Sequence, residues 1–518
     1  MKKASFFLRI ILILSTFFLL SFFKYDEMMS WEVYIFSCLC VFVSCFFGPV
    51  LFLTANLPFL IIAIIDLHLR RMYRISVLDA APWISMLILD TNRTEIYEYL
   101  LKINIMEYVL LFLIPLSVLF ARIYRPSRKV PKSFYLIFWL AFPMSYISHL
   151  YPTVEFFSAS EKKSVLRNYK NFSFAPTVSE KAAQNVILII GESHRYGEFQ
   201  ESFRKYEKKF ASLYNFSDFI SNYANTMDAV PVILSRKKFQ KNLNFFHEKS
   251  LFSLFEEAGY ETYFLHYTNS SNITEKNNLS FIYNEARHFI NFSSKDDSFH
   301  DIRIRHELKK ILAEKEQKKL IVIKMIGDHI DFEYRYPAPY DTRKPSLKGT
   351  KEAGFWKKIR SKTHLGSFYS PENKEAILNT YKNATDYSVE IIQNLFDLAK
   401  EQPASTLTVF SSDHGICIFD KAAFHIPPDC KEAFHIPVLF YLNPALSKTV
   451  DAEKVKNLFC NVDKPLTQEY LFETIVSLAG FSYPAANKEY DLTKKCFFSP
   501  VKRNVDLLLN GQFFYEDL

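Results

Sequence analysis

The chain contains 518 residues, of which 49% are hydrophobic and 17% aromatic, and it carries a formal net charge of +8 at pH 7. This charge is small for the length, and no basic helix with interleaved aromatic residues occurs, which argues against nucleic acid and for contact with anionic lipid. Residues 1–150 are dense in Phe, Leu and Ile, whereas the remainder has the mixed composition of a soluble domain. The composition therefore predicts a membrane region followed by a globular region that can bury its own core.

The first region, residues 1–150, is expected to be a transmembrane domain of about five helices. Each apolar stretch is near the ~17 to 25 residues that a tilted helix needs to cross ~30 Å of hydrocarbon. The stretches cover roughly residues 5–23, 31–48, 50–66, 104–121 and 133–150. Gly48-Pro49 separates the second from the third, which leaves either a hairpin or one kinked element. We interpret the first stretch as a retained anchor, because no small-residue cleavage site follows Phe23.

Loop charges predict the orientation of these spans. The loop 122–132 carries five basic residues and no acid, and Lys2 and Lys3 precede the first span, so both segments belong in the cytoplasm. Five spans then place the globular region on the outer side of the membrane. The loop 67–103 holds Arg70, Arg71 and Arg74 against this rule, but it is longer and also contains four acidic residues.

Residues 151–184 are polar, contain Pro152 and Pro176, and are expected to link the membrane domain to a globular domain formed by residues 185–518. In this domain, apolar runs with strand character alternate with helical patterns. Helices are predicted over 250–258, 375–399 and 467–478, and strands over 186–190, 260–266, 320–323, 406–410 and 438–441. This alternation predicts an α/β fold with a central, mostly parallel sheet sandwiched by helices.

Three of these predicted strands are followed by residues whose side chains commonly bind metals. The three groups are Gly191-Glu192, Gly327-Asp328-His329 and Asp413-His414-Gly415. Residues just past the carboxyl ends of parallel strands converge on one crevice, and each group contains a glycine, which permits tight turns and close approach. Zinc takes carboxylate and imidazole ligands together, so the pattern predicts a metal site. The alternative for Glu192 alone is a carboxylate that satisfies backbone amides at a helix N-terminus.

The seven cysteines divide between the two regions. Three lie within a predicted span and are expected to be buried apolar side chains (Cys38, Cys40 and Cys45). Four lie in the globular region, an even number consistent with two disulfides in an oxidising compartment (Cys417, Cys430, Cys460 and Cys496). Four cysteines allow three pairings, and sequence proximity favours Cys417 with Cys430 and Cys460 with Cys496.

Several motifs occur in an order that resembles a known family. They are Gly191-Glu192-Ser193, the segment Asn225–Pro231 around Thr226, Gly327-Asp328-His329 followed by Arg335-Tyr336-Pro337, Asn379-x-Tyr381-x-Asn383, Ser412–Gly415, and Phe434-His435-Ile436-Pro437. In the membrane half, Asp90-Thr91-Asn92-x-x-Glu95 resembles the family's extracytoplasmic loop between its third and fourth spans. Together they resemble the membrane phosphoethanolamine transferases of Gram-negative bacteria, in the alkaline phosphatase and sulfatase superfamily.

The resemblance implies a zinc-dependent transfer of phosphoethanolamine from phosphatidylethanolamine to lipopolysaccharide or lipooligosaccharide. Glu192, Asp413 and His414 match the family's main zinc ligands, and Thr226 matches the nucleophile, which also binds that zinc. In the implied mechanism Thr226 attacks the lipid phosphodiester, diacylglycerol leaves, and an acceptor hydroxyl attacks the phosphothreonine-type intermediate. The number of zinc ions stays open.

Further residues are carried over from the same resemblance. His329 and His425 match histidines that line the phosphoryl site, and spacing from Asp413 favours His425 over His435, for which a supporting role is expected. Donor contacts are assigned near the remaining matching positions (Asn92, Glu95, Asn269 and Ser270).

Three departures from the family pattern weaken the identity of the acceptor. Ile416-Cys417 follows Gly415 where the family commonly has Glu, and Asn222 and Val232 stand where lipid A enzymes often have cysteines. A lysine of the family's head-group pocket also has no clear equivalent near Asn269-Ser270. Lipid A phosphate, a core sugar and a periplasmic glycan therefore all stay open as acceptors.

The resemblance further implies a monomeric, multi-pass protein of the bacterial inner membrane, in contact with membrane lipid, whose catalytic domain lies in the periplasm. One alternative is a metal-dependent phosphodiesterase or sulfatase, although a sulfatase usually has Cys or Ser at the position of Thr226. A phosphoglycerol transferase would share five spans and the threonine, but the contexts of Glu192 and Arg335 fit the phosphoethanolamine group better. A non-enzymatic membrane scaffold would require broken ligands, and the four expected metal-site residues are intact.

Overall fold

The computed structural model of the chain describes residues 173–236, 238–239, 249–266, 282, 285–292, 301–314, 317–330, 332–348, 373–420, 430–497, 502–506 and 512–518. The expected transmembrane domain and most of the expected linker lie outside these residues, as do five candidate site residues (Asn92, Glu95, Asn269, Ser270 and His425). Among the described residues, no helix combines the length and the apolar character that crossing a membrane requires.

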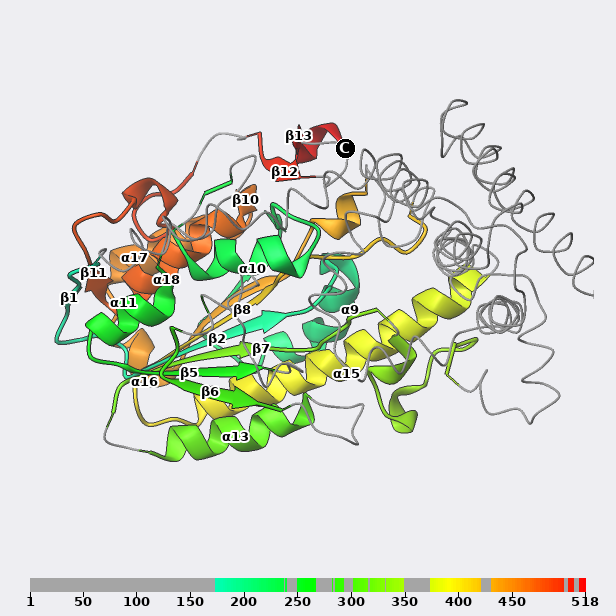
Figure 1. Ribbon diagram of the computed structural model, residues 1–518, viewed down its shortest axis with the longest axis horizontal. Coiled ribbons are helices and arrows are strands. Elements are labelled where there is room, and N and C mark those ends of the chain that lie inside the picture. The colour runs from blue at the N-terminus through cyan, green and yellow to red at the C-terminus, as the bar shows by residue number, and fades with distance from the viewer. Residues whose placement is uncertain are drawn as a thin grey trace, which may run out of the picture. The chain divides into compact units, whose positions relative to one another are not determined.

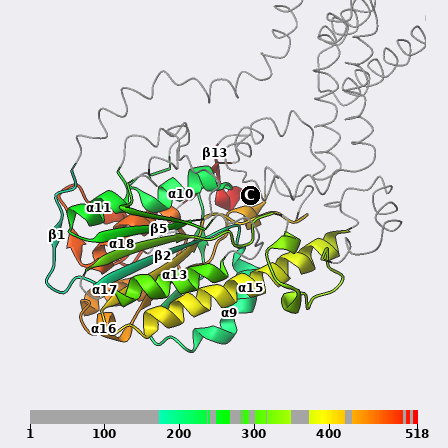
Figure 2. The same ribbon diagram turned by 60° about the horizontal axis from the view of Figure 1, so that its bottom comes forward.

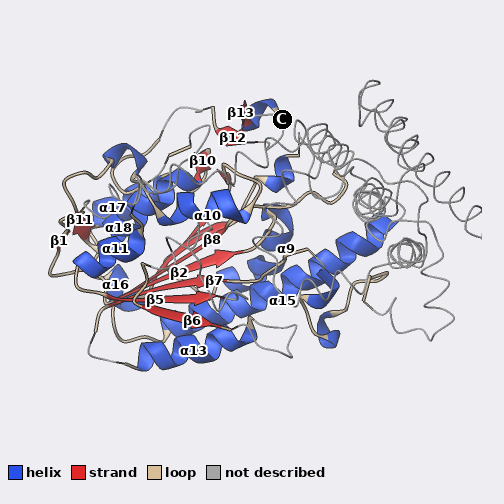
Figure 3. Ribbon diagram, in the orientation of Figure 1, coloured by secondary structure: helices blue, strands red, loops and turns tan. Residues whose placement is uncertain are grey.

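A seven-stranded sheet forms the centre of the described domain, in the strand order β3-β9-β8-β2-β7-β5-β6 (Figures 1 and 3). The strands are β2 (Asn185–Gly191), β3 (Leu213–Phe216), β5 (Glu261–His266), β6 (His288–Asn291), β7 (Lys319–Lys324), β8 (Thr406–Ser412) and β9 (Val438–Leu442). Strands β8, β2, β7, β5 and β6 pair in parallel, whereas β9 is antiparallel to both of its neighbours, β8 and β3. The predicted mostly parallel sheet is confirmed, with β9 as its one reversed strand among the described residues.

Helices cover both faces of this sheet, as the views in Figures 1 and 2 show. One layer contains α9 (Tyr196–Glu207), α13 (Ile302–Ala313) and the long α15 (Lys374–Lys400). The other contains α10 (Thr226–Leu234), α11 (Leu251–Glu257) and α18 (Leu471–Ala479). Alternate residues of β2, Val186, Leu188 and Ile190, join the apolar core of this second layer. Because both faces are covered, the central strands β2 and β8 are buried along their whole length.

Shorter elements complete the described domain. Helices α16 (Pro444–Ser447) and α17 (Ala452–Cys460) follow β9, and 3-10 helices cover Phe332–Tyr334, Ala338–Tyr340, Lys431–Ala433, Gln468–Tyr470, Lys488–Tyr490 and Tyr515–Asp517. Three two-stranded pairs lie outside the main sheet, namely β1 (Thr177–Val178) with β11 (Phe481–Ser482), β4 (Phe219–Ile220) with β10 (Leu466–Thr467), and β12 (Asn504–Asp506) with β13 (Gln512–Phe514).

Two segments differ in detail from the sequence-based expectation. The predicted helix 467–478 starts later, because Leu466–Thr467 pairs as β10 and a 3-10 turn precedes α18. Within the expected linker, Phe174 is buried in the core, and Thr177–Val178 pairs with β11. The last part of that segment therefore packs against the domain.

The four cysteines of the domain form two disulfides, Cys417 with Cys430 and Cys460 with Cys496. Both pairings favoured by sequence proximity are confirmed. The first bond closes a short loop that begins three residues after His414, next to the candidate site.

Candidate active site

The carboxyl ends of β2, β7 and β8 bring together residues that are far apart in the sequence. Glu192 directly follows β2, Lys324 is the last residue of β7, and Asp413 and His414 follow β8. Because β2 pairs in parallel with both β7 and β8, these side chains emerge at one edge of the sheet. One potential ligand atom from each of Glu192, Asp413 and His414 lies within 4.8 Å of the others.

Helix α10 brings Thr226, its first residue, to the same cluster. The Oγ1 atom of Thr226 lies 3.0 Å from Glu192 Oε2, 2.9 Å from Asp413 Oδ2 and 3.4 Å from His414 Nε2. The helix N-terminus favours negative charge on this oxygen. The structure therefore brings together the four residues expected to form the metal site.

Around the Thr226 hydroxyl, three possible acceptors face a single hydrogen. The Nδ1 atom of His414 lies 2.6 Å from Gly415 O, and a carbonyl oxygen can only accept. Nδ1 therefore carries the hydrogen of the neutral ring, and Nε2 presents a lone pair to the cluster. The single hydroxyl hydrogen of Thr226 faces this nitrogen and two carboxylate oxygens. Lone pairs gathered in this way favour a cation between them.

Their spacing suits a zinc ion. Tetrahedral zinc with bonds of ~2.0 to 2.1 Å separates its ligand atoms by roughly 3.3 Å. Here Thr226 Oγ1 lies 2.9 Å from Asp413 Oδ2, and His414 Nε2 lies 3.8 Å from the same oxygen. His414 Nε2 and Glu192 Oε1 are 3.4 Å apart. Two carboxylates, an imidazole and a hydroxyl at these distances could hold zinc without large rearrangement.

Neighbouring groups fix the orientation of both carboxylates. Ser193 Oγ donates a hydrogen bond of 2.8 Å to Glu192 Oε1, and Ser193 N donates one of 3.1 Å to Asp413 Oδ1. His414 N donates a further bond of 2.7 Å to Asp413 Oδ1. Ser193 has a φ of +59°, an unfavourable value for a residue with a side chain. That local strain occurs in a residue whose backbone N–H and side-chain hydroxyl each donate to one of the two carboxylates.

Lys324 contributes a positive charge that the sequence analysis did not assign. Its Nζ lies 2.6 Å from Glu192 Oε2 and 3.1 Å from Asp413 Oδ2, the two oxygens that also face Thr226. The lysine is 2% exposed. Burial alone would lower the pKa of Lys324, but Asp413 and Glu192 outweigh burial and raise it. Lys324 is therefore a buried cation in contact with both acids.

The same charges shift the pKa values of the two acids in opposite directions. Burial would raise the pKa of Glu192, but the charge of Lys324, together with the charges that His414 and His329 carry when protonated, holds it well below its ordinary value. Burial, reinforced by the charge of Glu192, raises the pKa of Asp413. Glu192 is thus the more strongly ionised of the pair.

Two glycines leave room that a side chain would fill. Gly327 has a φ of +45°, and a Cβ at this position would lie 2.9 Å from Glu192 O. A Cβ on Gly415 would collide with the backbone carbonyl of Glu432. The glycines beside the ligand groups therefore allow close backbone approach, as expected from the sequence.

Asp328 and His329 are adjacent in the sequence but have different surroundings. His329 is half-buried, and its charge helps to lower the pKa of Glu192. Asp328 is fully buried against α15, where Thr385 Oγ1 and Ser388 Oγ donate hydrogen bonds of 2.6 and 2.8 Å. Asp328 therefore anchors the loop that carries His329.

Tyr381 on α15 supports the loop that carries Glu192. Its hydroxyl donates a hydrogen bond of 2.9 Å to Ser193 O and accepts one of 2.8 Å from Arg195 N. Asn383, two residues further along α15, accepts a hydrogen bond of 3.0 Å from Arg343 N. The motif around Tyr381 therefore ties α15 to two loops.

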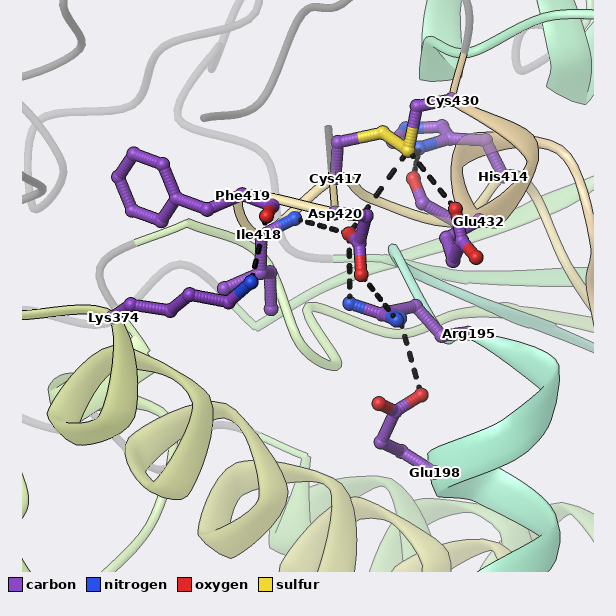
Figure 4. The surroundings of a disulfide bond; sticks show 11 residues. Arg195, Glu198, Lys374, His414, Cys417, Ile418, Phe419, Asp420, Cys430 and Glu432 are labelled. Carbon is purple, nitrogen blue, oxygen red and sulfur yellow. Dashed lines mark hydrogen bonds and ion pairs between the residues drawn. A yellow bond between two sulfur atoms is a disulfide. The ribbon is translucent and has the colours of Figure 1, made fainter. Parts of the chain in front are cut away.

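The segment after His414 is tied to the Glu192 loop by charge, as Figure 4 shows. Arg195 donates two hydrogen bonds to Asp420, of 3.1 and 3.0 Å, and it pairs with Glu198 at 3.1 Å. Cys417, Asp420 and Cys430 also lie near one another, but both sulfurs belong to the disulfide. His425 falls between these cysteines, outside the described residues.

The second histidine of this region faces away from the cluster. His435 Nε2 lies 3.1 Å from Ser217 O, and its ring stacks on Tyr196 at 4.3 Å between centroids.

Asn222, which stands at an expected cysteine position, donates a hydrogen bond of 2.9 Å to Asn504 O. This polar contact ties the segment before the nucleophile candidate to β12. Val232, at the other such position, is fully buried in α10.

Lys324 is the main site residue that sequence reasoning missed. Its signal was a lysine directly after the apolar run 320–323 and before the loop that carries Asp328 and His329. A charged side chain in a strand buried on both faces requires a buried partner of opposite charge. The supporting roles of Ser193 and Tyr381 had no such signal, because they depend on contacts between distant segments.

The fold and the cluster define the class of protein. The sulfatase family model matches residues 184–481, which is more than half of the chain. The chain therefore belongs to the sulfatase family.

Relatives narrow this class further. Phosphoethanolamine transferase EptC of Escherichia coli is 22% identical over 353 residues, which cover 62% of this chain and 56% of that protein. The chain thus matches little more than half the length of this relative. The C-terminal periplasmic domain of Escherichia coli EptC, solved in complex with Zn, has a TM-score of 0.55 at 19% identity, covering 66% of this chain and 96% of that domain.

A full-length membrane structure shares the fold as well. The integral membrane protein lipooligosaccharide phosphoethanolamine transferase A (EptA) of Neisseria meningitidis has a TM-score of 0.55 at 14% identity, with 94% of this chain and 97% of that chain covered. The resemblance to phosphoethanolamine transferases that the sequence motifs indicated is confirmed by these relatives.

Proposed function

We propose that the protein is a zinc-dependent phosphoethanolamine transferase that uses Thr226 as its nucleophile. One observation carries the proposal: the Thr226 hydroxyl lies within 3.0 Å of an oxygen of Glu192 and of Asp413, and 3.4 Å from His414 Nε2. A hydroxyl at the centre of a metal-type ligand set is suited to attack on phosphorus. The named relatives support phosphoethanolamine as the transferred group.

The donor in this proposal is phosphatidylethanolamine. Thr226 Oγ1 attacks its phosphorus, the bond from phosphorus to the glycerol oxygen breaks, and diacylglycerol leaves with a proton. A hydroxyl or phosphate of the acceptor then attacks the same phosphorus, the bond from phosphorus to Thr226 Oγ1 breaks, and a proton from the acceptor or from water restores the threonine hydroxyl. Glu192, Thr226, Asp413 and His414 would hold zinc, which when bound acidifies a coordinated hydroxyl and neutralises phosphoryl charge.

The residues of the chain prepare both steps. Glu192 and Asp413 offer acceptors for the Thr226 proton, and Ser193 keeps their other oxygens oriented. The N-terminus of α10 stabilises charge on the departing threonine oxygen in the second step. His329, and His425 by sequence position, are proposed to bind or neutralise the phosphoryl group.

The acceptor is proposed to be lipid A or a core sugar of lipopolysaccharide or lipooligosaccharide. The protein would act as a monomer at the inner membrane, with residues 1–150 spanning the bilayer and the catalytic domain in the periplasm. The two disulfides support an oxidising compartment for this domain. Asn92, Glu95, Asn269 and Ser270 are proposed to contact the donor.

Mass spectrometry of envelope glycolipids tests this function. Cells that express the full chain should contain glycolipids with an added phosphoethanolamine group, and fragmentation should locate it. Thr226→Ala should abolish the addition, whereas Thr226→Ser should retain part of it because it keeps a hydroxyl. Release of free phosphoethanolamine with no modified glycolipid would instead indicate a phosphodiesterase.

A further inference from the structure

The buried lysine beside the proposed metal site has no role in the mechanism above. Lys324 Nζ contacts Glu192 Oε2 and Asp413 Oδ2 at 2.6 and 3.1 Å, and it also approaches Gly191 O and Met325 O at 3.4 and 3.3 Å. With 2% of its surface exposed, this ammonium is held inside the protein by four oxygens. Its hydrogens are directed to the protein, so Lys324 acts through the carboxylates and not by touching substrate.

The charge balance of the centre suggests what Lys324 does. Glu192 and Asp413 contribute two negative charges, and a single divalent ion would only neutralise them. Lys324 leaves the loaded centre with one net positive charge, which an anionic phosphodiester and a developing threonine alkoxide both require. Other phosphoryl-transfer sites can provide such charge with a second metal ion.

We propose that Lys324 is the fixed second cation of this centre, so that the site binds one divalent metal ion and the lysine supplies the remaining positive charge. The inference rests on the proposed function for its catalytic consequence. Its prediction about metal binding stands independently, because it depends only on charge and geometry at the carboxylates. Lys324 is thus a positioning residue that orients Glu192 and Asp413 and limits the number of ions.

The same lysine also competes with the metal. It binds the oxygens that face Thr226 and repels an approaching cation. Removing its charge should therefore tighten metal binding while it impairs turnover. A lysine with a purely structural role would give the opposite pattern, in which its loss weakens metal binding and turnover together.

The test uses the full chain purified in detergent, stripped of metal and titrated with zinc against a chromophoric chelator. Elemental analysis of the reloaded wild-type protein should give one zinc per chain. Lys324→Gln should bind zinc at least about tenfold more tightly. Its kcat/KM with phosphatidylethanolamine should fall by about 100-fold or more, mainly through kcat.

Lys319 offers a matched control, because it is a buried lysine at the other end of the same strand. Its Nζ donates to the carbonyl oxygens of Glu314 and Gln317. Lys319→Gln should leave zinc affinity and kcat unchanged. Lys324→Arg keeps the charge and should bind zinc with an affinity closer to wild type than Lys324→Gln does.

Two outcomes would overturn the inference: two tightly bound ions in the wild-type protein, or weaker zinc binding by Lys324→Gln. If Lys324→Gln fails to fold, the inference is tested by the number of zinc ions bound to the wild-type protein and by the zinc affinity of Lys324→Arg. Failure of the proposed function looks different, because zinc titration would then behave as described while no phosphatidylethanolamine is consumed.

Discussion

The amino and carboxyl ends of the parallel strands form two edges of the central sheet, and the polar side chains at these two edges have different partners. At the amino edge, Asn185 Nδ2 donates a hydrogen bond of 3.2 Å to Thr406 Oγ1, and Thr406 N donates one of 2.9 Å to Asn443 Oδ1. Lys319 at this edge donates to backbone carbonyls. Each of these groups is neutral or faces neutral partners.

At the carboxyl edge, the same three strands place two carboxylates, a lysine, an imidazole and a hydroxyl in contact. Burial is similar at both edges, since Thr406 and Asp413 are both fully buried. The difference is the concentration of charge, which is costly in a protein interior unless each charge has a partner. The comparison indicates that the amino edge serves stability, whereas the charge at the carboxyl edge suits the proposed catalysis.

The largest effect should follow from a charge removed at the carboxyl edge. Asp413→Asn leaves Lys324 with a single acid and removes one metal ligand, so we expect kcat/KM to fall by about 10³-fold or more. Bound zinc and phosphatidylethanolamine turnover are measured on the same preparation. The amino-edge control is Thr406→Val, which should lower stability by about 1 to 3 kcal/mol and leave kcat intact.

A smaller effect should follow from crowding the backbone at the carboxyl edge. Gly415→Ala places a methyl group against the carbonyl of Glu432, and the resulting shift of the His414 loop should lower kcat by about 10- to 100-fold. Gly197 in α9 is the control, because a Cβ there meets nothing within 4 Å. Gly197→Ala should preserve activity and change stability by less than about 1 kcal/mol. Equal losses in both variants would contradict a special role for the His414 loop.

The smallest effect concerns a buried carboxyl outside the cluster. Burial raises the pKa of Glu285 to about 8, although Ser250 and Ser253 donate hydrogen bonds to its Oε2. Between pH ~4.5 and ~8 the folded protein holds a proton that the unfolded chain has lost, so this group makes stability fall as pH rises.

Glu285→Gln tests this linkage, because the neutral amide oxygen can accept the same hydrogen bonds. The variant should match wild type near pH 4.5 and be more stable by roughly 1 to 3 kcal/mol at pH 8. Denaturant unfolding across this pH range measures the difference. Parallel stability curves for the two proteins would refute the raised pKa. Turnover should be unaffected, which again separates stability from catalysis.

The sequence predicted the central strands of the sheet because these strands are buried on both faces, whereas β3 and β6 were not predicted. Such strands read as continuous apolar runs, and β2, β7 and β8 were located within a residue or two. The reversed direction of β9 had no local signal, since Val438–Leu442 is apolar whichever way it pairs. The late start of α18 depends on the pairing of Leu466–Thr467 with β4, a distant segment.

The candidate site was predictable only in part from the sequence. Glu192, Asp413 and His414 carried a signal in their position after strands, whereas Thr226 was selected only through family resemblance. Thr226 is the first residue of α10, and Asn225 caps this helix. The helix therefore holds the Thr226 hydroxyl in a fixed position, although the sequence around it resembles a loop. Lys324 escaped notice because its partners are more than 80 residues away in the sequence.

Direct detection of a modified Thr226 tests the central claim. The full chain, loaded with zinc, is exposed to phosphatidylethanolamine without acceptor, quenched in acid and digested for peptide mass spectrometry. The account predicts a phosphoethanolamine group on the peptide that contains Thr226, absent after metal removal. Turnover of the lipid with Thr226 unmodified, or full turnover by Thr226→Ala, would contradict it.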